Sequence, residues 1–229
     1  MNVLLLRLSG PMQSWGVQSR FSIRETGLEP SKSGVVGLLA AALGRPRAAD
    51  IGDLVRLTMA VRADAEGVLR YDYHTAKDVL KAGGGIKDTE PSRRYYLADA
   101  CFLVGLAGDD LALLQRLHAA LHDPVWPLFL GRKAFVPGEP VWLVDGLHPN
   151  ADLKIVLKAY PWLGHDEKNR PERVRLVLED SEGPEVRHDQ PGSFSDRIFA
   201  PRRVTMNFIL TSGFREHTPG EEAQCTSPV

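Results

Sequence analysis

Four side chains that can transfer protons lie close together in one short stretch of the chain. They are Tyr71, Tyr73, His74 and Lys77. Metal-free cleavage of RNA needs a base that activates a 2′-hydroxyl and an acid that protonates the leaving oxygen, and these residue types can fill both roles. The same residue types also stack on bases or contribute to packing. The residues alone therefore leave a metal-independent endoribonuclease open beside a structural or RNA-contacting stretch.

Other patterns for catalysis or metal binding are incomplete. His118 and His122 have the spacing of a zinc site, but position 119 is Ala instead of the Glu of a metalloprotease helix. The two cysteines, Cys101 and Cys225, cannot form a CxxC pair or a disulfide framework. A GxSxG nucleophile turn is missing. The sequence therefore predicts no metal and no cofactor, and surface positions for the two histidines.

A possible anion site precedes an apolar run at residues 35–43. Ser31, Lys32 and Ser33 lie where a helix would begin, and the first amides of a helix attract anions. A P-loop would need Gly directly before the Lys, so a nucleotide-triphosphate site is rejected. Trp15, in the loop before this helix, could stack on a base. The alternative is an ordinary capped helix with Trp15 packed in the core.

Composition and charge restrict the class of protein. The chain has 229 residues, 43% of them hydrophobic, and a formal net charge of −1, so no bulk positive charge indicates a polyanion partner. Between Arg7 and Arg47, however, six Lys or Arg residues outnumber two Glu residues. Nucleic-acid binding would therefore depend on local basic faces. Low cysteine content and the lack of a long apolar run predict a cytoplasmic protein without a membrane span.

Strand and helix patterns alternate along the first part of the chain. The expected elements are a strand at 2–8 that ends at the break of residues 9–11, a helix at 31–44, a short helix at 48–56, a strand at 58–63, a strand at 68–75, a strand at 95–106 and a helix at 109–122. Gly67 is expected to form the turn of a β-hairpin between the two middle strands. Residues 76–92, polar and with three consecutive glycines, are expected to form a mobile excursion that is either disordered or ordered by a partner.

This order predicts an α+β protein with a ferredoxin-like βαββαβ core, as in RNA-recognition folds. The closing strand is expected after residues 130–144. Beyond the core, residues 153–160 fit a strand or a short helix, 174–179 and 203–210 fit strands, and 182–192 fit a loop. We therefore predict one domain at 1–146 with an insertion at 76–94, a β-rich part at 147–215 that belongs to the same domain or a second one, and a flexible tail at 216–229.

Several blocks of sequence occur in an order that resembles a known family. The blocks are LLLRLSGPMQSWG, RFSIRET, PSKSGVVGLLAAALG, YDYHT, RRYYLADACFLVGL and PLFLGRKAF, within roughly the first 145 residues. They resemble the CasD family of subunits of the type I-E CRISPR surveillance complex, Cascade, which belongs to the RAMP group. Several blocks in the same order are more specific than any single motif.

The resemblance implies a non-catalytic, RNA-binding role in antiviral defence. Members of this family cap the 5′ handle of the mature CRISPR RNA and anchor the end of the CasC backbone. Residues 76–94 correspond to an inserted thumb hairpin that packs over the RNA. The implied partners are the CRISPR RNA, the CasC backbone subunits and the large subunit CasA. Target DNA is recognised by pairing with the guide. A separate subunit, CasE, cuts the precursor RNA, which disfavours the endoribonuclease interpretation of residues 71–77.

The candidate RNA-binding residues combine stacking groups, cations and one glycine that permits close approach of a sugar-phosphate chain. They are Gln13, Trp15, Arg24, Ser31, Lys32, Ser33, Tyr73, His74, Lys87, Arg93, Arg94, Gly131, Arg132 and Lys133. For each cation taken alone, a solvated surface charge is the competing interpretation. A purely structural assembly subunit that touches RNA incidentally is the third hypothesis.

Overall fold

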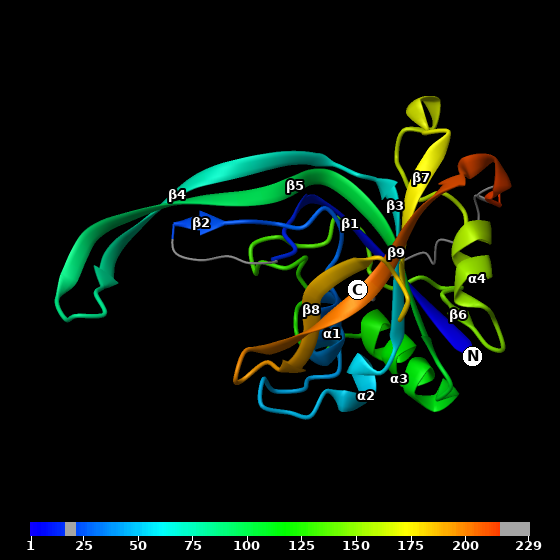
Figure 1. The fold of residues 1–229 in the computed structure, drawn as a ribbon, viewed down its shortest axis with the longest axis horizontal. Helices are drawn as coiled ribbons and strands as arrows, with labels where there is room; N and C mark the ends of the chain where they lie inside the picture. Colours follow the sequence, from blue (N-terminus) through cyan, green and yellow to red (C-terminus); the bar gives the residue numbers. More distant parts are fainter. Residues whose placement is uncertain (17–21, 216–229) are drawn as a thin grey trace, which may run out of the picture.

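A computed structural model describes residues 1–16 and 22–215. It shows a mixed α/β fold with one large, mainly antiparallel sheet and few helices (Figure 1). The strands are β1 (Asn2–Gln13), β2 (Ile23–Arg24), β3 (Thr58–Ala65), β4 (Val68–Leu80), β5 (Ile86–Gly108), β6 (Leu147–His148), β7 (Arg173–Glu179), β8 (Glu185–Ser193) and β9 (Ile198–Leu210). The helices are α1 (Lys32–Ala42), α2 (Gly52–Val55), α3 (Leu111–His122) and α4 (Leu153–Ala159), with 3-10 turns at Glu167–Asn169 and Thr211–Gly213.

The sheet has the order β6-β1-β5-β3-β7-β9-β8, and β2 and β4 also pair with β5. Strand β5 is its centre, because it pairs with β1 along one edge and with β3 and then β4 along the other. Among the described strands that pair with β5, β2 alone runs parallel to it. The pairing of β7 with β3 joins the strands of the C-terminal part to the same sheet. The predicted division of the chain at residue 146 stays a prediction.

The helices cover both faces of the sheet and bury its apolar side chains. On one face, α1 and α3 pack Leu39 and Leu114 against Phe102 of β5 in the larger core. On the other face, α4 places Leu157 over Leu103 in a smaller core. Burying one leucine completely stabilises the fold by about 1.5–3 kcal/mol. The helix expected at 31–44 is confirmed as α1, and most of its apolar side chains are buried.

Two predicted breaks in the strands, the end of the first strand at residues 9–11 and the hairpin turn at Gly67, were wrong for the same reason. Pairing between β1 and β5 continues past residues 9–11 to Gln13, although Pro11 has no N–H to contribute. The predicted hairpin at Gly67 does not form, since β3 and β4 run in the same direction and both pair with β5. Gly67 has φ +71° and bends the strand without reversing it. A proline or a glycine disturbs a strand locally. Here Pro11 does not end β1 and Gly67 does not reverse the chain, because the neighbouring strand β5 continues alongside and keeps pairing on both sides of each residue.

Residues 76–94 form a hairpin, as the family resemblance implied, and not the irregular excursion that composition predicted. Strand β4 pairs with β5 from Val68 opposite Ala98 to Leu80 opposite Ile86, so these residues form the outer part of one long hairpin. We call residues 68–98 the hairpin arm; it projects from the body of the molecule (Figure 1). The turn at 81–85 uses the positive φ of Gly84 and Gly85. Polar sequence misled the prediction because a two-stranded arm exposes both of its faces.

The C-terminal part was predicted less well. Residues 153–159 form a helix, and 173–179 form the expected strand. The predicted loop at 182–192 is wrong, since it contains β8, and β9 begins at Ile198, five residues before the predicted start. Charged residues of β8 form ion pairs with other elements, so the strand lacks a simple apolar alternation. The predicted tail at 216–229 lies outside the described residues.

Candidate nucleic-acid interface

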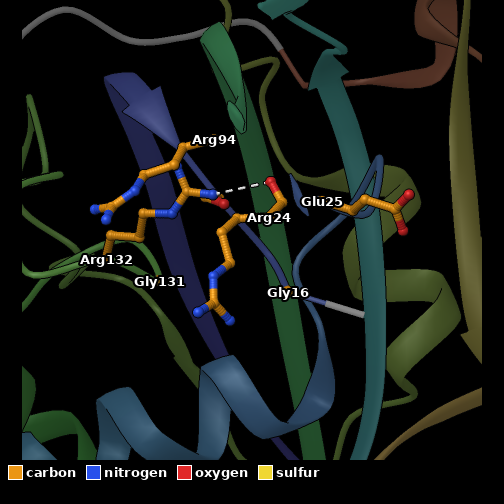
Figure 2. A pocket seen from close by; sticks show the side chains of 7 residues that line it. Gly16, Arg24, Glu25, Arg94, Gly131 and Arg132 are labelled. Atoms are coloured by element: carbon orange, nitrogen blue, oxygen red, sulfur yellow. Dashed lines mark hydrogen bonds between the residues drawn. The ribbon is translucent and has the colours of Figure 1, made fainter. Parts of the chain in front are cut away.

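A pocket of about 400 Å³ lies where the base of the hairpin arm meets two loops (Figure 2). Arg24 comes from β2, Arg94 from β5 and Arg132 from the loop that follows α3. Its other lining residues are Ser14, Gly16, Glu25 and Gly131. Three guanidinium groups from segments far apart in sequence therefore surround one hollow.

Backbone pairing and a few polar contacts bring these arginines together. The parallel pairing of β2 with β5 places Arg24 beside Arg94. Arg94 Nε donates to Ser92 Oγ at 3.2 Å, and Arg132 Nη2 donates to the Arg24 carbonyl at 3.3 Å. The Arg132 guanidinium also lies 5.4 Å from the centre of the Phe135 ring. Each arginine thus keeps donors available for a ligand, since a guanidinium has five N–H groups.

Three arginines and one carboxylate, that of Glu25, line the pocket, so its lining carries a net positive charge. Burial and the neighbouring Arg94 and Arg24 lower the pKa of Arg132, and only Asp72 acts in the opposite direction. An arginine stays charged in a protein despite such a shift, so the repulsion persists. None of the three guanidinium groups forms a salt bridge with a carboxylate of residues 1–16 or 22–215. An anion with several oxygens, such as a nucleic-acid phosphate, would relieve this repulsion.

Gly131 shapes the pocket from within. It has φ +88°, and a Cβ atom built on it would lie 1.7 Å from the Ser14 carbonyl oxygen. The N–H of Ser14 bonds to the Leu130 carbonyl at 3.1 Å. The sequence interpretation placed an RNA backbone next to this glycine. In the structure, the close approach is made by the protein's own backbone, and Gly131 allows Arg132 to reach the pocket.

Trp15 and Gln13 were wrongly assigned to RNA contact. Trp15 is 1% exposed and packs on Gly34 of α1, where a Cβ would lie 2.8 Å from its ring. Gln13 is fully buried and donates to the carbonyls of Leu8 and Ala100 at 3.0 and 2.7 Å. It also accepts from Trp15 Nε1. These two side chains support the loop that carries the pocket. For Trp15, packing in the core is the alternative that the sequence left open.

The expected anion site at the start of α1 is also corrected, because the protein fills it. Lys32 is 2% exposed; its backbone N–H donates to Asp189 at 2.8 Å, and its Nζ donates to Glu179 at 2.7 Å. Ser31 is buried and caps the helix by accepting from the Gly34 N–H. Ser33 Oγ lies 3.4 Å from Ser31 Oγ. The carboxylate of Asp189 takes the place predicted for a phosphate.

The remaining candidates divide between the two faces of the hairpin arm, because side chains alternate along a strand. Tyr73 and Arg93 are opposite each other and share one face with Lys87, whereas His74 shares the other face with Arg94. Tyr73 is 64% exposed. Lys87 forms a salt bridge with Glu90, and Arg93 lies 5.9 Å from the Tyr71 ring centre. Lys133 is exposed beside the pocket residue Arg132. The arm thus offers an aromatic face and a pocket face.

The same alternation separates the residues of the proposed endoribonuclease. Tyr73 and Lys77 point to one face of β4 and His74 points to the other. His74 Nδ1 lies 3.7 Å from a carboxylate oxygen of Asp72 on its own face. A shared reaction centre would require the strand to be rearranged.

The histidines and the cysteine considered for metal binding or catalysis pack against other parts of the protein. The rings of His118 and His122 both lie against Trp142, and His118 Nε2 is 2.9 Å from the Leu143 carbonyl. Within residues 1–16 and 22–215, no cluster of three or more His, Cys, Asp or Glu side chains could hold a metal ion. Cys101 is buried, and this burial raises the pKa of its thiol to about 12. Cys225 lies outside the described residues.

A family model described as CRISPR-associated protein (Cas_Cas5) matches residues 3–205. The chain belongs to this family. It is 34% identical over 180 residues to the CRISPR system Cascade subunit CasD of Escherichia coli (strain K12), which covers 71% of this chain and 79% of the relative. These matches confirm the resemblance seen in the sequence blocks.

Two solved structures are similar to this member of the Cas5 family over nearly its whole length. One, described as a crystal structure of a Cas protein, is 46% identical with a TM-score of 0.80, and the match covers 95% of this chain and 100% of that one. The other, from a CRISPR RNA-guided surveillance complex, is 33% identical with a TM-score of 0.75, and the match covers 97% and 96%. The mixed α/β fold is therefore shared with both structures.

Sequence reasoning missed three lining residues of the pocket, Ser14, Gly16 and Glu25. Ser14 and Gly16 flank the Trp that attracted attention, and the pairing of β2 with β5 could not be read from a two-residue strand. Among the described residues, no helix is long and apolar enough to cross a membrane.

Proposed function

We propose that this Cas5-family protein is a non-catalytic RNA-binding subunit of a type I-E CRISPR surveillance complex, where it caps the 5′ handle of the mature CRISPR RNA. The observation that carries the proposal is the pocket of Arg24, Arg94 and Arg132, whose three guanidinium groups outnumber the one carboxylate of its lining, that of Glu25. Salt-dependent phosphate contacts of this kind supply most of the affinity in protein–nucleic acid complexes. The exposed tyrosines of the arm add faces on which bases can stack.

The names of the relatives support the partners in this proposal. The Escherichia coli relative is a Cascade subunit, and one solved relative comes from an RNA-guided surveillance complex. We extend this setting to the present chain, with the CRISPR RNA, CasC backbone subunits and the large subunit CasA as partners in the cytoplasm. Target DNA is reached only through the guide, which reads sequence by base pairing.

The finer fold assignment belongs to the same proposal. The elements β1, α1, β3, β5, α3 and β6 follow the βαββαβ order, and the spatial order β6-β1-β5-β3 is the arrangement of a ferredoxin-like, RNA-recognition-like core. In this interpretation the hairpin arm is an extension of two core strands. Strands β7 to β9 widen the sheet beyond the core.

Binding of the purified protein to a short RNA with the 5′ handle, against a scrambled RNA of equal length, tests the proposal. We expect preference for the handle and no cleavage on a gel in EDTA. Arg94→Ala should weaken binding, whereas Arg116→Ala, an exposed arginine of α3, should not. Cleavage lost in His74→Ala would instead favour the endoribonuclease. Equal binding of both RNAs by the protein and by the assembled complex would reject handle recognition.

A further inference from the structure

Arg175 of β7 connects two segments that are far apart in the sequence. Its Nε and Nη2 donate to the two carboxylate oxygens of Glu66, at 2.9 and 2.6 Å. Its Nη1 donates to Glu29 Oε2 at 2.5 Å, and Nη2 also reaches the Leu28 carbonyl at 2.9 Å. The Arg175 side chain is 9% exposed and that of Glu29 is 11% exposed. The guanidinium is therefore almost entirely used inside the protein.

Glu66 lies where the hairpin arm leaves the sheet. Strand β3 ends at Ala65, and Gly67 bends the chain into β4 so tightly that a Cβ atom there would lie 2.6 Å from the Ala98 carbonyl. Strand β7 accompanies β3 only as far as the pair of Ala63 with Arg175. The Arg175 side chain thus reaches past the last paired position to hold the first residue beyond β3.

Glu29 lies just after the pocket residues of β2. Its other carboxylate oxygen accepts from Arg187 Nε of β8 at 3.0 Å. Near the start of the same segment, the Gly27 N–H donates to the Trp15 carbonyl at 2.6 Å. The stretch between Arg24 and α1 is therefore fixed at one end by the core and at the other by two arginines of the C-terminal strands.

The geometry points to Arg175 as a positioning residue that sets the direction of the hairpin arm relative to the arginine pocket. Arg94 moves with the arm together with its paired neighbour Arg24, whereas Arg132 belongs to the loop that follows α3. A change in the angle of the arm would therefore separate Arg132 from the other two guanidinium groups. The bidentate contact to Glu66 fixes direction as well as distance, which a lysine could not do. The consequence for RNA rests on the proposed function; the consequence for the arm does not.

Distances between two spin labels on the free protein test the role in the arm. The background is Cys225→Ser, which leaves the buried and unreactive Cys101, and labelled cysteines replace Lys81 at the arm tip and Arg116 on α3. We expect one narrow distance distribution for this background and a broad one for Arg175→Gln and for Glu66→Gln. Arg175→Lys should be intermediate. Glu66 is half-exposed, so its variant should fold even if Arg175→Gln does not.

Arg173→Gln is the matched control. It lies two residues earlier on β7, is exposed, and forms no salt bridge with a residue that the structure describes. Its distance distribution should match that of the background. Unchanged distributions in both Arg175→Gln and Glu66→Gln would overturn the inference.

RNA binding by the same proteins separates this inference from the proposed function. Arg175→Gln should weaken binding of the handle RNA about tenfold, the size typical for residues that act through others. Arg94→Ala should weaken binding without changing the distance distribution. If the background protein does not bind the handle at all, the proposed function fails while the distances still decide the role of Arg175. A broadened arm with unchanged RNA affinity would contradict control of the pocket by the arm.

Discussion

At the scale of single residues, a cation is informative for function only when its partners are known. Lys32 and Arg94 are both basic residues in family-matching blocks, so the sequence favoured both equally as RNA contacts. Lys32 is buried against Glu179 and its N–H is taken by Asp189, whereas Arg94 faces a hollow with two other arginines. The first is part of the folded core, and the second is available to a ligand.

Lys32→Met should therefore affect stability without affecting RNA binding. It leaves the partly buried carboxylate of Glu179 without its lysine partner, which for a buried pair costs about 3–5 kcal/mol. Urea unfolding measures the loss, and RNA affinity of the folded fraction should stay within about twofold, since no positioning contact of the pocket is lost. Lys154→Met, at an exposed position of α4, is the control for removal of a positive charge. If Lys32→Met lowered RNA affinity as much as Arg94→Ala does, the hypothesis of a phosphate site at the start of α1 would be supported again.

Gly131→Ala should damage both stability and the pocket. The new Cβ would collide with the Ser14 carbonyl, and a φ of +88° is unfavourable for alanine, which together cost at least about 1–3 kcal/mol. Thermal unfolding and handle RNA affinity should both decrease, because relief of the collision moves Arg132. At Gly16, which also lines the pocket, a Cβ would meet nothing within 4 Å. Equal effects of Gly16→Ala and Gly131→Ala would contradict this explanation.

At the scale of elements, the sequence was informative where burial follows a simple period. The apolar run of α1 and the leucine spacing of α3 predicted both helices, and the β5 residues from Tyr95 onward predicted a buried strand. The family resemblance implied the arm as a thumb hairpin, but the residue pattern alone did not predict it. Its stability comes from backbone pairing between two exposed strands, which leaves no apolar period in β4. The pocket was predicted only in part, since Arg24, Arg94 and Arg132 meet through pairing between distant segments.

Shortening the arm should leave the body folded. Residues 75–91 can be replaced by an Asn-Gly turn that joins His74 to its partner Ser92, because β4 pairs with β5 alone in this region. We expect an unchanged thermal midpoint and a retained pocket. Incorporation of the protein into the surveillance complex should decrease, as measured by co-purification with the other subunits. Normal incorporation would show that the arm is not needed for contact with the other subunits.

At the scale of the whole molecule, one sheet carries the pocket and the strands that hold it in place. Strand β5 runs from the arm through the centre of the sheet, and β7 joins β3 to the C-terminal strands. Ion pairs between Arg175, Arg187 and Glu29 extend this connection to the loop before α1. The overall charge of −1 does not reveal where the unpaired cations lie. Most cations of the C-terminal strands form ion pairs within the protein, whereas the three arginines of the pocket form none with a carboxylate that the structure describes.

The salt dependence of handle RNA binding is the most direct test of the central claim that the three-arginine pocket binds RNA phosphates. The logarithm of the affinity is plotted against the logarithm of the salt concentration for the native protein and for the triple variant Arg24→Ala, Arg94→Ala, Arg132→Ala. For single-stranded nucleic acid each lost phosphate contact lowers the slope by about 0.7, so the variant should lose about 2 units of slope together with most of its affinity. An unchanged slope in a folded triple variant would place the RNA elsewhere and contradict the proposal.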